Sequence, residues 1–256
     1  MGTAISVDVR DDIDAAAVDE VFAWFQHVDD TFSTYQPDSS ISRLARGEIT
    51  VGDCPPEVGW VLDRCEDLRR ETGGAFDAWA AGSLDPSGFV KGWSVDVASS
   101  MLAAQGSANH CINAGGDVRV RGQPEPDRGW NTGIAHPLVA GRLTVVITAT
   151  EAGIATSGTA ERGRHIVDPR TGTACGALAS VTVVGPDLTS ADSYATAAVA
   201  LGLDAPGWLE GLADHEAYVI DARGKVWWTD GFTEYAPQLA AARSRQPSHR
   251  TNRLVR

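Results

Sequence analysis

The pattern of apolar residues changes near Cys111. Before it, residues 12–33 and 55–74 carry apolar residues at helical spacing, and a further helix is predicted from Val90 to about Gln105. After it come short apolar runs separated by Gly, Pro and Asp, as in strands joined by turns. Because helices come first and strands later, without β-α-β alternation, the sequence predicts an α+β fold with largely antiparallel sheets.

The later part of the chain completes this prediction. A helix is predicted from Ser190 to Leu203, a short helix near Leu209, and a terminal hairpin that turns at residues 222–224. The predicted strands lie within residues 4–9, 111–122, 130–136, 142–150, 164–169 and 177–185.

Composition excludes several classes of protein. A hydrophobic content of 43% with eight Trp indicates a packed globular protein, and a formal net charge of −13 argues against nucleic-acid binding. Four scattered cysteines suggest buried free thiols rather than a zinc site or a redox pair. No segment reaches the ~18 apolar residues of a membrane span, and no signal peptide is recognised, so we expect a cytoplasmic enzyme or binding protein.

The last 14 residues differ from the rest. Residues 243–256 contain five Arg and no acidic residue. We expect a disordered basic tail that follows a single domain over residues 1–242, and the alternative is a segment that binds an acidic partner.

Residues 190–202, SADSYATAAVALG, place Asp192 and Thr196 four residues apart on a predicted helix. Positions i and i+4 share one helix face, so the carboxylate and the hydroxyl can converge on a hard cation such as Mg²⁺. The alternative is structural: Ser190 or Asp192 caps the helix, and Thr196 packs with its methyl group inward. Spacing alone leaves both interpretations open.

Three other segments carry polar residues near turns. In LDPSGFVKGWSVD, Asp85 opens a turn, Ser87 and Gly88 permit close approach of the backbone, and Lys91 is predicted in the first turn of a helix, where a diphosphate could bind. In NAGGD, the glycines before Asp117 are explained by a turn between strands, so we assign that segment no catalytic role.

The third segment, GIATSGTAERGRHIVDPRTG, contains Ser157, His165 and Asp168. No G-x-S-x-G elbow is present and the three residues crowd together, which argues against a serine hydrolase. His165 is a candidate general base, because an ordinary histidine pKa of ~6.5 suits proton transfer near neutrality. A purely structural histidine is the alternative.

Taken in order, eight short segments resemble the ApbE family of FAD:protein FMN transferases. They are MGT, STYQPDSSISRL, TGGAFDAW, LDPSGFVKGWSVD, NAGGDVRVRG, HIVDPRTG, SVTVVGP and ADSYATA. The resemblance implies two tightly associated lobes with a flavin cleft between them. It also implies a Mg²⁺-dependent enzyme that splits FAD, joins FMN to a Ser or Thr hydroxyl of an acceptor protein, and releases AMP.

The same resemblance implies roles for particular residues. His165 would be the base, and the metal would be held by Asp192, Thr196 and the backbone carbonyl of Gly88. Flavin contacts would come from Met1, Tyr35, Ala75, Phe76, Asp77, Asp85, Lys91 and Val167. The alternatives are a Mg²⁺-dependent FAD pyrophosphatase that yields FMN and AMP, and an FAD-binding protein without turnover.

Overall fold

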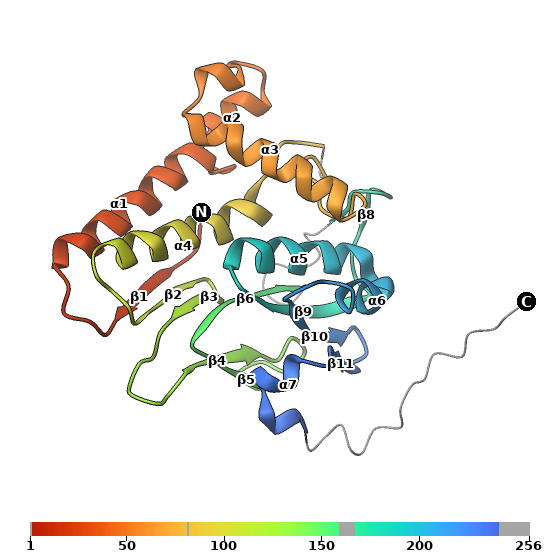
Figure 1. The fold of residues 1–256 in the computed structure, drawn as a ribbon. Coiled ribbons are helices and arrows are strands. Elements are labelled where there is room, and N and C mark those ends of the chain that lie inside the picture. The colour runs from red at the N-terminus through yellow and green to blue at the C-terminus, as the bar shows by residue number, and fades with distance from the viewer. Residues whose placement is uncertain (1, 81, 159–166, 241–256) are drawn as a thin grey trace, which may run out of the picture.

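A seven-stranded antiparallel sheet forms the centre of the computed structural model, which describes residues 2–80, 82–158 and 167–240 (Figure 1). Its strands lie in the order β1-β2-β3-β6-β9-β10-β11, and every neighbouring pair is antiparallel. Their bounds are β1 Ile5–Val9, β2 His110–Ala114, β3 Asp117–Arg121, β6 Glu151–Gly158, β9 Leu178–Gly185, β10 Glu216–Asp221 and β11 Val226–Trp228. The α+β prediction with antiparallel pairing is therefore confirmed.

Helices cover one face of this sheet, and a separate hairpin covers the other (Figure 1). The helices on the first face are α1 Ala15–Phe32, α2 Ser40–Ala45, α3 Pro56–Glu71, α4 Ser87–Ala104, α5 Leu188–Leu201 and α6 Ala205–Leu209. The hairpin consists of β4 Trp130–Ala135 and β5 Leu143–Ala149, and α7 Phe232–Tyr235 lies beside it. A short two-stranded ladder joins β7 Val167–Asp168 to β8 Thr173–Ala174.

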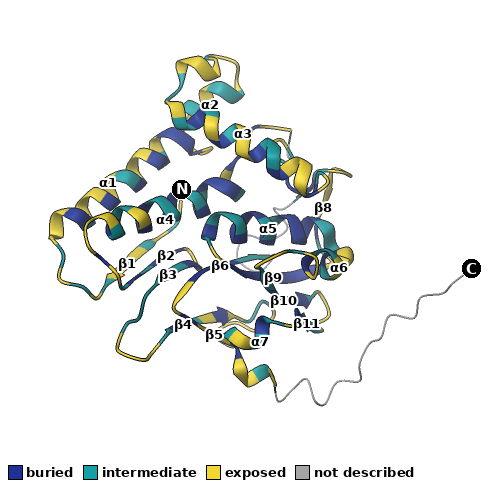
Figure 2. Ribbon diagram, viewed as in Figure 1, coloured by how far each residue is buried: buried dark blue, intermediate teal, exposed yellow. Residues whose placement is uncertain are grey.

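The two faces of the sheet bury two separate hydrophobic cores. In β10, Ala217 and Val219 pack in the core under the helices, whereas Tyr218 and Ile220 pack with the β4–β5 hairpin. Successive side chains of a strand point to opposite faces, so both faces must be apolar when both are covered. Figure 2 shows the result as buried residues along the central strands and on the helices over them.

The starts of two helices differ from the prediction. Helix α4 begins at Ser87 rather than Val90, which puts Lys91 in its second turn. Helix α5 begins at Leu188 rather than Ser190, because the extended Asp187 is the N-cap and its side chain accepts a hydrogen bond from Ser190 N at 2.7 Å. The prediction that Ser190 or Asp192 caps this helix is therefore wrong.

Strand β6 was not predicted. Its sequence, EAGIATSG, is rich in small residues that lack a strand signature. The structure explains the glycine at position 153: a Cβ there would lie 2.3 Å from Asp187 C and Leu188 N, where α5 begins. This glycine is required by a contact with a distant segment, which the local sequence pattern does not reveal.

Three of the sequence predictions fall outside the described residues, namely Met1, His165 and the tail 243–256. The four cysteines are free thiols, as predicted, but only Cys65 and Cys175 are buried, whereas Cys54 and Cys111 are partly exposed. Within the described residues, no helix has both the length and the apolar composition needed to cross a bilayer.

His110, at the start of β2, has no exposed surface and is held between two serines. Its Nε2 lies 2.7 Å from Ser99 Oγ and its Nδ1 2.9 Å from Ser107 Oγ. Burial, together with the positive charges of Arg121 and Arg119, lowers the pKa of His110 to about 4. The native protein therefore holds this ring neutral over a pH range in which an unfolded chain protonates it.

We expect this ring to make the protein less stable as the pH falls from about 6.5 to 4. Between these pH values His110 is protonated in the unfolded chain but not in the folded chain. This difference in proton binding lowers the free energy of unfolding by about 3 kcal/mol. His110→Gln should flatten this decline, while lowering stability at pH 7. Urea denaturation at a series of pH values measures both, and an equally steep decline in His110→Gln would contradict the assignment.

Candidate active site

The predicted site residues line a cavity of about 670 Å³. All ten of those within the described part of the chain line it: Tyr35, Ala75, Phe76, Asp77, Asp85, Gly88, Lys91, Val167, Asp192 and Thr196. They come from the loops that follow α1 and α3, from the start of α4 and the loop before it, and from β7 and α5. Residues of the β4 hairpin, including Ile134 and His136, line it as well, so the helical layer and the hairpin both contribute to one cleft.

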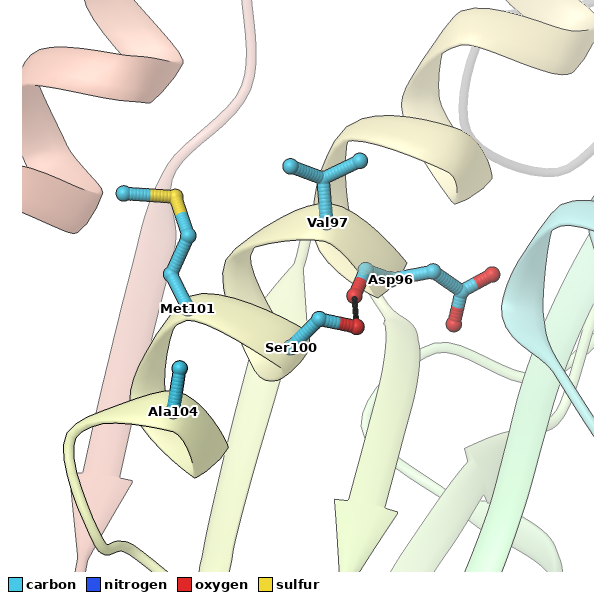
Figure 3. Close-up of a pocket in the computed structure, with 5 residues that line it drawn as sticks. All are labelled: Asp96, Val97, Ser100, Met101 and Ala104. Carbon is cyan, nitrogen blue, oxygen red and sulfur yellow. Dashed lines mark hydrogen bonds between the residues drawn. The ribbon is translucent and has the colours of Figure 1, made fainter.

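A second hollow, of about 420 Å³, lies elsewhere on α4 (Figure 3). Its lining residues are Asp96, Val97, Ser100, Met101 and Ala104, all from this one helix. None of the predicted site residues belongs to it. We therefore assign the candidate active site to the larger cavity.

The loop before α4 aims the helix start at the cavity. Asp85 N donates to Ala78 O at 2.7 Å, and Asp85 Oδ1 accepts from Ser87 N at 3.0 Å. Such an aspartate turn fixes the backbone through the next residues. Gly88 then lies against α5, because a Cβ added to it would be 3.5 Å from Thr196 Oγ1.

The start of α5 is fixed from α4. The Asp96 carboxylate accepts hydrogen bonds from Leu188 N at 3.1 Å and from Thr189 N at 2.8 Å. These are two of the backbone donors that a helix N-terminus leaves unpaired. With Asp187 as the cap, this contact sets where α5 begins and so where Asp192 and Thr196 face.

Lys91 lies between two buried carboxylates. Its Nζ is 2.5 Å from Asp117 Oδ2 and 3.3 Å from Asp192 Oδ1, and these aspartates are 2% and 1% exposed. Burial lowers the pKa of Lys91, but the charges of Asp192 and Asp117 outweigh it and hold that pKa above its usual value. Lys91 therefore gives the cavity a positively charged ammonium group at neutral pH.

Asp192 is the most enclosed acid of the site. Its Oδ2 accepts from Gly92 N at 3.2 Å, while Oδ1 faces Lys91. Burial raises the pKa of Asp192; Lys91 opposes this effect and Asp117 adds to it. A nearby cation stabilises the charged form of a carboxylate that is buried in this way.

Asp192, Thr196 and Gly88 line the same cavity and carry oxygen donors of types that suit a hard cation. Thr196 Oγ1 lies 3.2 Å from Ser157 Oγ, and the Gly88 carbonyl accepts from Ser193 Oγ at 3.4 Å. One carboxylate, one hydroxyl and one carbonyl are the ligand types that Mg²⁺ takes, alongside water and phosphate. The described residues contain no cluster of three His, Cys, Asp or Glu, but a site of this kind needs none.

The serine-hydrolase arrangement finds no support in the described residues. Both oxygens of Asp168 are engaged by Arg170, with Nε at 2.9 Å from Oδ1 and Nη2 at 3.0 Å from Oδ2. Ser157 instead lies beside Thr196. These contacts agree with the argument against serine catalysis.

Asp117 is the site residue that the sequence analysis missed. The turn at Gly115 and Gly116 is confirmed, with φ of +63° and +99°. The residue after it, however, contacts Lys91 inside the cavity. An acid at the first position of a strand was the available signal, because strands are depleted in aspartate.

Gly92 allows α4 and α5 to approach closely. A Cβ on Gly92 would lie 2.4 Å from Leu188 O and 2.9 Å from Thr189 Cα, both backbone atoms. We expect Gly92→Ala to destabilise the fold by about 1–3 kcal/mol, since overpacking against backbone exceeds the helix-propensity gain of about 1 kcal/mol. It should also weaken ligand binding, because Gly92 N contacts Asp192.

Urea denaturation checks this expectation against a matched variant. Gly207, in α6, has no atom within 4 Å of an added Cβ, so Gly207→Ala should not lower stability and should raise it by up to about 1 kcal/mol. Equal stability of the two variants would show that the α4–α5 contact tolerates a side chain.

The chain resembles known proteins along much of its length. The chain is 34% identical over 163 residues to the FAD:protein FMN transferase of Vibrio cholerae, which covers 60% of this chain and 47% of that protein. It is 31% identical over 132 residues to the FAD:protein FMN transferase of Haemophilus influenzae, covering 47% of this chain and 38% of that protein. The chain thus spans about half or less of the curated relatives it matches.

Solved structures share the fold. The flavin transferase ApbE from Vibrio cholerae superposes with a TM-score of 0.79 at 22% identity, covering 92% of this chain and 96% of that chain. The ApbE protein from Thermotoga maritima gives a TM-score of 0.79 at 19% identity, covering 91% and 96%. The model of the ApbE family matches residues 1–84 and 79–219, which is most of the sequence. The chain therefore belongs to the ApbE family.

Proposed function

We propose that the chain is a Mg²⁺-dependent FAD:protein FMN transferase. Its substrates are FAD and an acceptor protein with a Ser or Thr flavinylation motif, and its products are the FMN-bearing protein and AMP. One observation carries the proposal: ten residues implied by the family resemblance, scattered from Tyr35 to Thr196, line a single cavity. The names of the curated relatives support the same reaction.

The cavity suits a flavin nucleotide. Its volume of about 670 Å³ falls within the ~300–1,000 Å³ of ordinary ligand pockets. Tyr35 lines the cavity although it is 80% exposed, so its ring is available to cover a planar ligand. Phe76, by contrast, is 3% exposed and contributes a fixed apolar wall. We propose flavin contacts from both, and from Met1, Ala75, Asp77, Asp85, Lys91 and Val167.

The diphosphate would lie near the charged end of the cavity. Asp192, Thr196 and the Gly88 carbonyl would hold Mg²⁺, which when bound neutralises charge on the bridging phosphates. Lys91 adds a fixed positive charge from the protein. Positioning and charge stabilisation account for most catalysis of phosphoryl transfer, and these residues provide both.

The chemical step needs a base for the acceptor hydroxyl, and we propose His165 for it. The acceptor oxygen forms a bond to the FMN phosphorus while the bridging P–O bond to AMP breaks. His165 takes the hydroxyl proton, and AMP leaves with the bridging oxygen. Each bond formed is matched by a bond broken, so no oxidant or reductant is required.

Mass spectrometry of an acceptor peptide tests this function. With FAD and Mg²⁺, the peptide should gain one FMN on its Ser or Thr, and AMP should appear in equal amount. Rapid conversion of FAD to FMN and AMP over many turnovers without acceptor would favour a pyrophosphatase instead. FAD that stays intact with Mg²⁺ and acceptor present would favour a binding protein.

A further inference from the structure

The two carboxylates that share Lys91 hold it unequally. The ammonium lies 2.5 Å from Asp117 Oδ2 but 3.3 Å from Asp192 Oδ1. Electrostatic attraction between opposite charges weakens as their separation grows. Asp117 is therefore the nearer of the two carboxylates that hold the ammonium.

Asp117 is itself fixed by the sheet. It begins β3 and is 2% exposed, and its Oδ1 accepts a hydrogen bond from Thr156 N of β6 at 2.8 Å. One oxygen thus bonds the neighbouring strand while the other holds Lys91. Its side chain is locked between two elements, which is the condition for positioning another group.

This arrangement affects Asp192. One of its oxygens is bonded to Gly92 N, and the other is 3.3 Å from Lys91. An ammonium that lost Asp117 would remain beside a single buried carboxylate, and the two would pair closely. Such a pair would occupy the oxygen that a metal ion needs.

We propose that Asp117 is a positioning residue of the active site. It holds the Lys91 ammonium toward β3, where Lys91 faces the phosphates of the substrate and leaves an oxygen of Asp192 accessible to a divalent cation. This inference rests on the proposed function, because it concerns the same cation and the same diphosphate.

The test is Mg²⁺ titration of the protein–FAD complex by calorimetry, which needs no acceptor and no turnover. Asp117→Asn preserves size but releases Lys91, so the Mg²⁺ concentration for half-saturation should rise about tenfold. In a Lys91→Met background the same substitution should have little further effect, because Asp117 acts through Lys91. Lys91→Met alone should leave the midpoint at or below the wild-type value.

A matched control separates positioning from general destabilisation. Asp11 also accepts backbone and side-chain hydrogen bonds, from Asn109, but does not line the cavity. Asp11→Asn should lower thermal stability without moving the Mg²⁺ midpoint. If Asp117→Asn does not fold, Lys91→Met alone still tests the proposal. A Mg²⁺ midpoint above the wild-type value in Lys91→Met would overturn it.

The other outcomes are equally distinct. Asp117→Asn could raise the Mg²⁺ midpoint as much in the Lys91→Met background as in the wild type. That result would make Asp117 a direct cation ligand and overturn the positioning role. An unshifted midpoint in Asp117→Asn contradicts the role of Asp117 alone. A wild-type complex with no saturable Mg²⁺ response contradicts the proposed function itself.

Discussion

Asp192→Asn is expected to reduce Mg²⁺-dependent FMN transfer at least about a thousandfold, equivalent to about 4 kcal/mol of transition-state stabilisation. The amide keeps the size of the side chain but loses the charge that would hold the cation. Asp192 is 1% exposed, so solvent does little to screen the loss of that charge. Transfer of FMN to an acceptor peptide, followed by mass at several Mg²⁺ concentrations, measures the loss.

Asp187→Asn is the matched control for this variant. Asp187 lies on the same helix as its N-cap, and Asn caps helices about as well as Asp. Transfer should therefore remain near the wild-type level. Undiminished Mg²⁺-dependent transfer in Asp192→Asn would remove Asp192 from the metal site, whatever the control shows.

The structure excludes the capping role that was one of the two interpretations of SADSYATAAVALG. A capping role for Ser190 or Asp192 required the helix to begin near them, but α5 begins at Leu188 and its cap is Asp187. Asp192 is thus a buried acid inside a helix, facing an ammonium. Such a residue costs free energy unless it is paired or binds a cation.

Elements set by local sequence were predicted well. Helix α3 and the β2–β3 hairpin follow from apolar spacing, prolines, and glycines with positive φ. The terminal hairpin of β10 and β11 was likewise predicted from its turn at residues 222–224. In each case the determining interactions lie within a few residues of one another.

Features set by long-range contacts were not predicted. Strand β6 has a glycine at position 153 because the start of α5 lies against it. Asp117 lies in the site because β3 places it beside Lys91, which comes 26 positions before it in the chain. The spacing of residues in the sequence did not predict that Gly88 lies beside Thr196. Only the family resemblance suggested this pair.

His165→Ala is expected to reduce FMN transfer by about 10² to 10⁴ while FAD binding changes little, since a general base contributes that much to a rate. FAD binding by fluorescence and transfer by mass spectrometry measure the two effects separately. His165 lies outside the described residues, so this prediction rests on the sequence segment HIVDP and its family resemblance.

The competing candidate is His136, which lines the cavity. Its Nδ1 accepts a hydrogen bond from Leu138 N at 3.1 Å, so a neutral ring carries its proton on Nε2. Neither nitrogen is then free to accept a proton, which makes His136 a poor base while this turn is intact. Loss of transfer in His136→Ala with full transfer in His165→Ala would reverse the assignment. Equal loss of FAD binding and transfer in His165→Ala would instead make His165 a structural residue.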